Sequence, residues 1–265
     1  MPDVSTSLLL DHFVTALRTG VRPVAVWAHG SLAGGDYQEG RSDLDLIAVL
    51  DGPVTQDLRS RLRKLHRNLR ATHPLAARLH CGYLDRERLT DADLAHPAWA
   101  HERLLDRPVT PVTRRELHAF GRVFQGPGPV DLLPPVDPAE LRDFLVRDQR
   151  DYWRPAVERA ELWRRDIWVD LGLLTHARAA VALSEGRLIT KGEALTVLAG
   201  AGAPAEVLAD IRERRYGEAE SRESRGEGAD GARKDGADEA WLGRRAALTR
   251  DFLAPAIDAL VAAYR

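Results

Sequence analysis

The sequence is poor in cysteine, with Cys81 as its single one among 265 residues. One cysteine excludes an internal disulfide and is typical of a protein kept in a reducing compartment. No stretch approaches the roughly 18 apolar residues that a membrane-spanning helix needs. The opening residues, MPDVSTSLLLDHF, lack the basic segment and long apolar core of a signal peptide. We therefore expect a cytoplasmic protein without a membrane segment.

Neither sign of charge dominates the composition. The chain has 38 Lys and Arg against 40 Asp and Glu, a formal net charge of -2 at pH 7. Proteins that bind nucleic acid or an anionic membrane surface usually carry a basic excess, so we expect neither partner. The P-loop signature G-x-x-x-x-G-K-[ST] is absent too. The glycines of Ala199–Gly202 lie between predicted helices and indicate a helix end, not a phosphate loop.

The first half of the chain mixes helical and strand patterns. Apolar residues at helical spacing predict one helix over residues 5–19 and another beginning at Thr55. Short apolar runs predict strands over Val24–Ala28, Leu44–Leu50 and residues 76–84. This order is typical of a small α+β or α/β domain.

The second half follows an irregular stretch over residues 97–138. Within it, residues 107–120 indicate a short helix, and the Pro- and Gly-rich residues 124–138 are interpreted as a linker. Beyond it the apolar period is near 3.6 residues, with predicted helices over 139–153, 157–186, 191–202, 204–217 and 239–264. We therefore predict an α+β fold in which a small mixed-sheet domain, residues 1–130, precedes an all-α helical bundle, residues 131–265.

One segment fits neither domain. Residues 217–239 contain no aromatic residue and no aliphatic one larger than alanine. Such a segment cannot bury enough apolar surface to offset the entropy of ordering. We predict a disordered surface loop there.

Two acidic residues open the second predicted strand, in the run HGSLAGGDYQEGRSDLDLIAVL. Acidic residues are poor strand formers, so their presence indicates a function. Because side chains alternate along a strand, Asp43 and Asp45 share one face, with Cα atoms about 7 Å apart. Carboxylates at this spacing suit Mg²⁺, which prefers few protein ligands plus substrate phosphates. Gly30 and Ser31, after the preceding strand, can bring backbone N–H groups and a hydroxyl close to a phosphate.

This arrangement resembles the polymerase-β-like nucleotidyltransferases, whose signature is Gly-Ser, about ten residues, then Asp-x-Asp. The whole chain is similar to aminoglycoside adenylyltransferases of the streptomycin/spectinomycin type, which add a C-terminal helical domain. Beside the Gly-Ser and Asp-x-Asp run, three stretches carry the resemblance: FQGPGPVDLLPPV, LLTHARAAVALSEGRLITKGEAL and PAEVLADIRERRYG.

The resemblance implies Mg²⁺-dependent transfer of AMP from ATP to a hydroxyl of a small cationic acceptor, an aminoglycoside antibiotic. It implies that Asp43 and Asp45 are the catalytic Mg²⁺ ligands. The nucleotide's phosphates would be bound by two sets of residues, Gly30, Ser31 and Ser42 in the first domain and Arg178, Lys191 and Tyr216 in the second. Cations suit that role, because several phosphates lie close to two carboxylates.

The family's third carboxylate, the general base, has no equivalent here. The aligned position is His80, and a histidine can accept a proton at neutral pH. Alternatively, His80 is a half-buried strand residue and catalysis is weak or lost. Asp85, further along the same strand, is a less apt substitute. Cys81 next to His80 does not make a zinc site, because two ligands are too few.

The acceptor site is predicted on the segment ELWRRDIWVDLGLLTH, where the family uses acidic and aromatic residues. Asp166 and Asp170 lie four residues apart and so share a helix face, close to Trp168. The tryptophans here, Trp163 included, are equally well explained as core residues.

Other functions remain open. The acceptor could be a different metabolite or a protein side chain, or the chain could be a nucleotide-binding regulator that has lost catalysis. Nothing in the sequence indicates an oligomer, so we expect a monomer.

Overall fold

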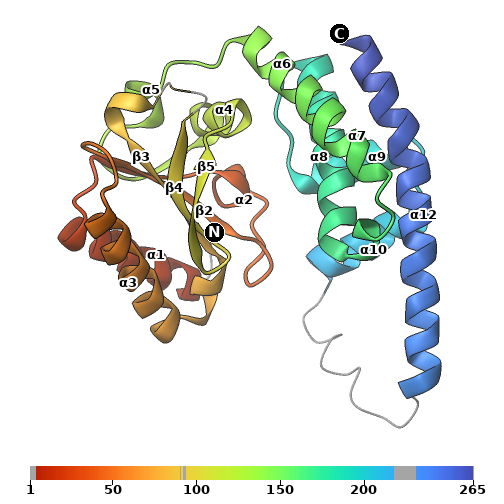
Figure 1. The fold of residues 1–265 in the computed structure, drawn as a ribbon, viewed down its shortest axis with the longest axis horizontal. Helices are drawn as coiled ribbons and strands as arrows, with labels where there is room; N and C mark the ends of the chain where they lie inside the picture. Colours follow the sequence, from red (N-terminus) through yellow and green to blue (C-terminus); the bar gives the residue numbers. More distant parts are fainter. Residues whose placement is uncertain (1–3, 90, 92–93, 218–230, 265) are drawn as a thin grey trace. The chain divides into compact units, whose positions relative to one another are not determined.

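The computed structural model describes residues 4–89, 91, 94–217 and 231–264. The chain forms two compact units, Met1–Asp137 and Pro138–Arg265. The first unit combines a sheet with helices, and the second is helical (Figure 1). The division falls a few residues beyond position 130, near which the sequence placed the domain boundary.

The first unit is built on a six-stranded sheet with the order β5-β4-β3-β2-β1-β6. β2 and β3 are parallel, and the other neighbouring strands are antiparallel. The mixed sheet followed by helices confirms the predicted α+β class. The strands are β1 (Ala25–Ala28), β2 (Leu44–Leu50), β3 (Leu79–Asp85), β4 (Ala95–Ala100), β5 (Arg103–Pro108) and β6 (Arg122–Gln125).

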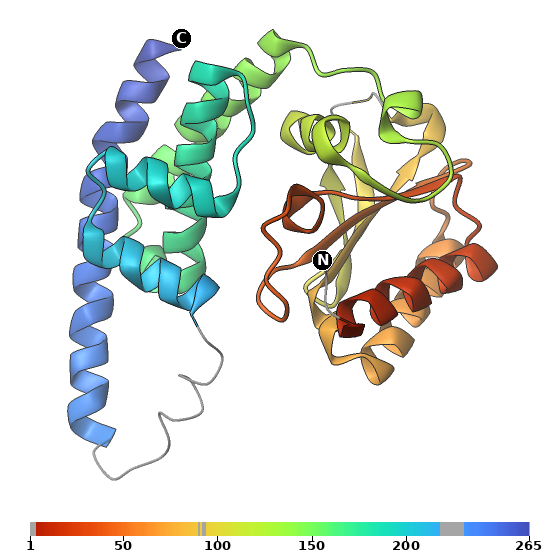
Figure 2. The same cartoon turned by 180° about the vertical axis from the view of Figure 1, so that it is seen from behind.

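Two long helices, α1 (Val4–Gly20) and α3 (Gln56–Thr72), cover one face of this sheet (Figure 2). Phe13 of α1 and Leu62 of α3 are fully buried in one cluster with Leu46 of β2. The side chain of Thr55 caps α3 by accepting the Leu58 N–H at 3.3 Å. α3 also supplies the crossover that a parallel strand pair requires.

The shorter helix α4 (Pro111–Phe120) lies on the other face. Leu117 of α4 is buried with Trp27 of β1 and Ile47 of β2. The remaining short elements are α2 (Gly30–Gly34), η1 (Pro74–Arg78), η2 (Arg86–Arg88) and α5 (Pro129–Leu132). The predicted Gly30–Ser31 turn is therefore the start of a short helix, and the third strand begins at Leu79, three residues later than predicted.

The short helix predicted within residues 107–120 is present as α4, but the strands of the stretch 97–138 were not predicted. This stretch holds most of the β4–β5 hairpin, then α4, β6 and α5. The hairpin turns at His101 and Glu102, which have φ of 50° and 59°. Tight hairpins need positive φ and are recognised in sequences by Asn or Gly, neither of which is present. β6 comes from the Pro- and Gly-rich run and pairs with β1.

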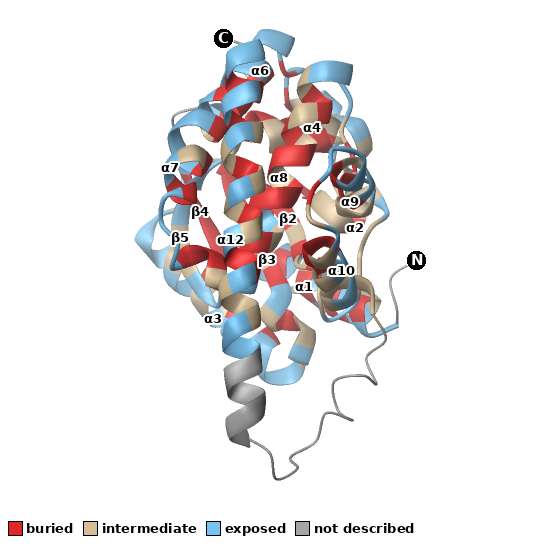
Figure 3. Cartoon of the chain, turned by 90° about the vertical axis from the view of Figure 1, so that its right-hand side faces the viewer, coloured by how far each residue is buried: buried red, intermediate tan, exposed pale blue. Residues whose placement is uncertain are grey.

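The second unit is a bundle around a core that includes Trp153, Trp163, Val169, Ile211 and Leu253. The central helix, α8, is largely buried (Figure 3). The elements are α6 (Pro138–Asp148), η3 (Gln149–Trp153), α7 (Arg154–Val157), η4 (Leu162–Arg164), α8 (Asp166–Glu185), α9 (Lys191–Gly200), α10 (Ala205–Tyr216) and α12 (Gly231–Ala263).

The single helix predicted over residues 157–186 is interrupted, because α7 ends at Val157 and α8 begins at Asp166. Trp163 causes the break by folding into the core, where its Nε1–H donates to Ala156 O at 2.8 Å. Gly172 of α8 makes room for it, since a Cβ there would lie 2.5 Å from the indole.

The final helix starts earlier than predicted, at Gly231 instead of Glu239. Residues 231–239 lack large apolar side chains, but Ala and long charged residues have high helix propensity. The rest of the predicted loop, residues 218–230, lies outside the described residues. Within the described part of the chain, no helix is long and apolar enough to cross a membrane.

Candidate active site

The two predicted metal ligands lie at the start of β2. Leu44 and Leu46 are buried in the core. Asp43 and Asp45 alternate with them, and their side chains are 40% and 33% exposed. Both carboxylates approach the same ring nitrogen, His80 Nδ1, at 4.0 Å from Asp43 Oδ2 and 3.6 Å from Asp45 Oδ1. They therefore face the same side of the sheet.

Gly30 makes a close approach to one of these carboxylates. Its φ is +61°, and a Cβ at this position would lie 2.7 Å from Asp45 Oδ2. The neighbouring His29 N–H donates to Asp45 O at 3.0 Å. The Gly-Ser segment and the Asp pair are thus joined directly, and only glycine leaves the Asp45 carboxylate in its place.

Glu116 of α4 fixes this segment, and no sequence signal pointed to it. Its carboxylate is buried and accepts the Gly30 N–H at 3.3 Å and a hydrogen bond from His29 Nδ1 at 3.1 Å. Burial is the largest influence on His29 and acts to lower its pKa. The hydrogen bond to Glu116 and the charges of Asp45 and Glu116 together outweigh it and raise the pKa.

His80 lies on β3 directly opposite Asp45 in the parallel register. The backbone N–H of His101 donates to His80 Nε2 at 3.4 Å. This contact assigns the proton of the neutral imidazole to Nδ1, which faces the carboxylates. His80 is therefore placed beside the Asp pair as expected, with its lone pair toward the His101 backbone.

The substitutes considered for His80 lie elsewhere. Asp85 is at the far end of β3, opposite Leu50, and accepts the Glu87 N–H at 3.1 Å as a cap of η2. Cys81 is buried in the core that faces α1 and α3. Burial raises the pKa of its thiol to about 12, which disfavours the thiolate that zinc binding or nucleophilic attack requires.

Ser42 and Ser31 differ in their surroundings. Ser42 is buried, and its hydroxyl accepts the Gln38 N–H at 3.1 Å, which orders the turn before Asp43. Its role in the structure is to hold that turn. Ser31 is the second residue of α2 and is partly exposed, so its hydroxyl can reach a ligand.

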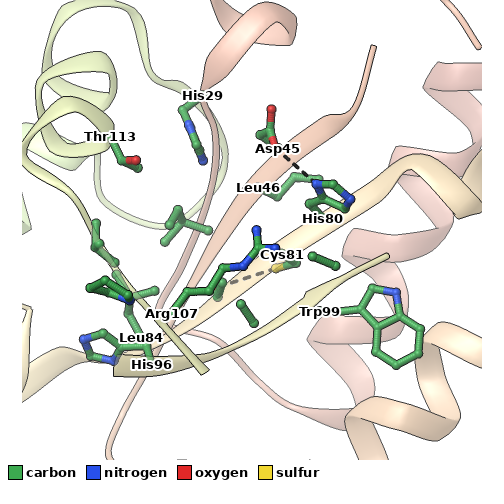
Figure 4. A pocket seen from close by; sticks show the side chains of 16 residues that line it. His29, Asp45, Leu46, His80, Cys81, Leu84, His96, Trp99, Arg107 and Thr113 are labelled. Carbon is green, nitrogen blue, oxygen red and sulfur yellow. Dashed lines mark hydrogen bonds and ion pairs between the residues drawn. The ribbon is translucent and has the colours of Figure 1, made fainter. Parts of the chain in front are cut away.

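A cavity of about 140 Å³ opens beside Asp45 and His80 (Figure 4). It lies on the face of the sheet opposite α1 and α3. Its polar lining consists of His29, Asp45, His80, His96, Arg107 and Thr113. The cavity shows that the sheet beyond the Asp pair is hollowed and not filled by core side chains.

The predicted phosphate-binding residues of the second unit lie on three helices, α8, α9 and α10. Arg178 Nε donates to Ile189 O at 3.0 Å, which brings it close to the start of α9. Lys191 is the first residue of α9, just after the capping residue Thr190. Tyr216 ends α10, where the Arg215 guanidinium lies 5.6 Å from its ring. Arg178 and Lys191 therefore lie close to each other at the start of α9.

The predicted acceptor residues are engaged in an ion-pair network. Asp170 pairs with Arg214, which also pairs with Asp210. Asp166 Oδ1 lies 2.7 Å from the buried Arg245 Nη1. Burial raises the pKa of Asp170 against the opposing pull of Arg214. These acids bind α8 to α10 and α12, and they do not form a free anionic patch.

The tryptophans near these acids pack against one another. Trp163 is fully buried in the core of the second unit. Trp168 is partly buried, and its ring packs edge-on against Trp153 and Trp163, 6.0 and 6.3 Å away. This supports the core interpretation of the tryptophans.

The residues present fit a divalent cation. In the described residues no group of three or more His, Cys, Asp or Glu could hold a metal by itself. Mg²⁺ is commonly held by one or two carboxylates together with substrate phosphates. Asp43 and Asp45 are partly exposed and face one side, and the missing Cβ of Gly30 leaves the Asp45 carboxylate room. This donor set suits Mg²⁺ bound together with a nucleotide.

Comparison with known proteins agrees with this geometry. Residues 10–124 match the model of the nucleotidyltransferase domain family. The chain thus carries a nucleotidyltransferase domain, and the resemblance to polymerase-β-like nucleotidyltransferases is confirmed. No curated protein is similar enough in sequence to count as a match.

A solved structure resembles the whole chain. Spectinomycin adenyltransferase AAD(9) from Enterococcus faecialis, solved with ATP and spectinomycin, superposes with a TM-score of 0.64. The identity is 13%, over 93% of this chain and 98% of that chain. At this identity the likeness shows a shared fold, in which a helical unit follows the nucleotidyltransferase domain.

Proposed function

We propose that the protein transfers AMP from ATP to a hydroxyl of a small acceptor, in the presence of Mg²⁺. One observation carries this proposal: Asp43 and Asp45 face one side of β2, and a Cβ at Gly30 would displace the Asp45 carboxylate. A strand and a turn with no further role would not need the Gly30 backbone to lie this close to the Asp45 carboxylate.

In the proposed reaction, the acceptor oxygen forms a bond to the α-phosphorus of ATP. The bond from that phosphorus to the bridging oxygen of the β-phosphate breaks, and pyrophosphate leaves. Mg²⁺, held by Asp43 and Asp45, would neutralise phosphate charge and align the attacking and leaving oxygens. The acceptor's proton passes to His80 or to water. For His80 to accept it, Nε2 has to exchange the His101 N–H for the acceptor hydroxyl.

Ser31 is proposed to bind the triphosphate with its hydroxyl. The resemblance assigns Arg178, Lys191 and Tyr216 to the nucleotide, and this assignment stays a prediction. Replacing Arg178 or Lys191 with Gln is expected to raise the KM for ATP.

Two acceptor classes are in question. The relative solved with spectinomycin favours an aminoglycoside, and this would make the protein an antibiotic-resistance enzyme. The ion pairs of Asp166 and Asp170 favour an acceptor that is not polycationic, because the acids expected to bind it are already neutralised.

The test is pyrophosphate release from ATP with a panel of hydroxylated acceptors that includes spectinomycin and streptomycin. Asp43→Asn and Asp45→Asn are each expected to reduce turnover at least about 100-fold. Mutating a residue that only orients a metal ligand already costs up to about 100-fold, and loss of a ligand itself is expected to cost no less. Asp51→Asn, an exposed carboxylate just after β2, is the matched control and keeps activity. ATP binding with no turnover on any acceptor would instead identify a nucleotide-binding regulator.

A further inference from the structure

The cavity beside Asp45 contains an arginine without a carboxylate partner. The Arg107 side chain projects into the cavity from β5 (Figure 4). In the part of the chain that the structure describes, it forms no ion pair or side-chain hydrogen bond. The guanidinium of Arg59, by contrast, is paired with Asp106, the residue before Arg107, at 2.6 Å. An unpaired guanidinium in a cavity is a ready binding group for a carboxylate or phosphate.

Side chains alternate between the two faces of the sheet along β5, and this alternation determines which way Arg107 points. Asp106 points toward α3, where it meets Arg59. The next residue, Arg107, therefore points to the opposite face, above β4 and β3. It pairs with His96 in the strand register. The strand thus separates its two charges, one to each face.

The floor beneath Arg107 is made of small residues. Gly82 of β3 pairs with Ala98 of β4, and Ala100 lines the cavity two residues further along. A Cβ at Gly82 would meet Leu84 and Ile47 at 3.2 and 3.3 Å. Because Gly82, Ala98 and Ala100 have no side chain or a single methyl group, a small molecule can lie against the strands there with its acidic group at Arg107.

The polar side chains that line the cavity are basic or uncharged, except for one carboxylate at one end. Histidines 29, 80 and 96 line the cavity with Arg107, and Asp45 is the single carboxylate among the lining residues. Arg103 and Arg107 also both act on the nearby His101, where burial and then positive neighbours lower the pKa. A polycation would meet like charge at the Arg107 end.

The strand order places Arg107 on the acceptor side. From the Asp pair on β2, the Gly30–Ser31 segment lies toward β1, and Arg107 lies in the other direction, beyond β3 and β4. If phosphates of the donor bind at Ser31, the cavity at Arg107 is left for the second substrate. This step rests on the proposed function.

We propose that the cavity is the acceptor subsite and that it takes a small hydroxylated molecule with a carboxylate or phosphate group, which Arg107 binds. The acceptor hydroxyl is then presented to Asp45 and His80 at the other end of the cavity.

The test measures binding without turnover. Calorimetry with D-gluconate and with glycerol 3-phosphate, without ATP, compares the full-length wild type with Arg107→Gln. Arg107→Gln keeps hydrogen-bond donors but removes the charge. We expect at least one of the two anions to bind the wild type and to bind Arg107→Gln 10–100-fold more weakly, the usual loss for a charged hydrogen bond. Glycerol, without the acidic group, is expected not to bind.

The matched control is Arg103→Gln. Arg103 lies on the same strand and the same face, four residues away, and does not line the cavity. It is expected to bind the anions as the wild type does. If neither anion binds the wild type, or if Arg107→Gln and Arg103→Gln bind them equally, the subsite is disproved.

Two further measurements separate this proposal from the function it rests on. If Arg107→Gln weakens ATP binding and leaves anion binding unchanged, Arg107 contacts the donor and the acceptor assignment is wrong. Tight binding of spectinomycin that Arg107→Gln does not weaken would also overturn it. Anion binding that depends on Arg107 supports the subsite even if no pyrophosphate is released, an outcome that would count against nucleotidyl transfer alone.

Discussion

His80 Nδ1 lies 3.6 Å from Oδ1 of Asp45, across the parallel pair of β2 and β3. The register Asp45↔His80 puts an imidazole beside the Asp pair, at the position where the resemblance to nucleotidyltransferases implies a third carboxylate. Replacing a carboxylate by an imidazole keeps a proton acceptor and removes a negative charge from the centre of the site.

The first prediction concerns this imidazole. His80→Ala is expected to lower kcat for nucleotidyl transfer by about 100-fold or more, the usual contribution of a general base, with little change in the KM for ATP. His80→Glu, which restores a carboxylate, is expected to recover part of the loss. Steady-state kinetics of pyrophosphate release measures both.

The matched control is His101→Asn. It removes the neighbouring ring, 4.8 Å from that of His80, but keeps the backbone N–H and tolerates positive φ. It is expected to retain activity. Equal losses in His80→Ala and His101→Asn would show that His80 acts through packing.

The second prediction compares two glycines with positive φ. Alanine at Gly30 or Gly35, with φ of +61° and +80°, should cost about 1–2 kcal/mol of unfolding free energy, the strain of a left-handed backbone. At Gly30 the new Cβ would also push the Asp45 carboxylate aside, whereas nothing lies within 4 Å at Gly35. Gly30→Ala should therefore lose Mn²⁺ affinity in an electron paramagnetic resonance titration with ATP, and Gly35→Ala should not.

The third prediction concerns acid sensitivity. His66 is buried, with Tyr83 Oη 2.6 Å from its Nε2, and burial lowers its pKa from 6.5 to about 3. The unfolded chain therefore binds a proton between these pH values that the folded state does not bind. Stability is full above pH 6.5 and falls toward pH 3, by about 1.4 kcal/mol per pH unit for this group. His176 in the second unit, with a pKa of about 4, adds a similar loss there.

His66→Gln keeps a polar partner for Tyr83 and cannot titrate. It is expected to flatten the fall of the first unit's stability with decreasing pH, measured by hydrogen exchange of β3 peptides in urea. The exposed His12→Gln is the control and should keep the wild-type slope. An unchanged slope in His66→Gln would mean that other groups carry the acid sensitivity.

The fourth prediction concerns the acids of α8. Arg214→Ala leaves Asp170 and Asp210 without this partner, and it is expected to destabilise the second unit by about 2–4 kcal/mol, somewhat below the loss for a fully buried pair. Asp170→Asn should lower the urea midpoint less, because the amide still accepts a hydrogen bond. It should leave the acceptor KM unchanged. A tenfold rise in the KM for spectinomycin would instead show that Asp170 binds a cationic acceptor.

The sequence predicted those parts of the candidate site that lie close together in the chain. Asp43 and Asp45 were found because acids are out of place in a strand, and β2 has the predicted bounds, Leu44–Leu50. His80 could be aligned because β3 follows β2 after one crossover helix. These features depend on local pattern and on one pairing.

Glu116 and Arg107 could not be found in this way. Glu116 accepts a hydrogen bond from Gly30, which lies 86 residues away in the sequence. In the sequence of α4 it is indistinguishable from an ordinary acidic residue of a helix. Arg107 depends on the β4–β5 hairpin, whose turn has no glycine or asparagine. For Asp166 and Asp170, the sequence correctly predicted that they share a helix face. It could not predict their ion pairs, because the arginine partners come from the distant helices α10 and α12.

The last strand of the first unit, β6, determines how far a fragment must extend if it is to fold as an isolated catalytic domain. β6 shields β1, which leads directly into Gly30, and the Trp27 indole N–H donates to Pro127 O at 2.8 Å. A polypeptide cut at residue 124, where the family match stops, would lose Gln125 of β6, which pairs with Val26, and the Pro127 carbonyl that accepts from Trp27, and the cover of β1 would be weakened. Expression trials of an isolated catalytic half should therefore run through Asp137, and shorter pieces are expected to aggregate by edge pairing.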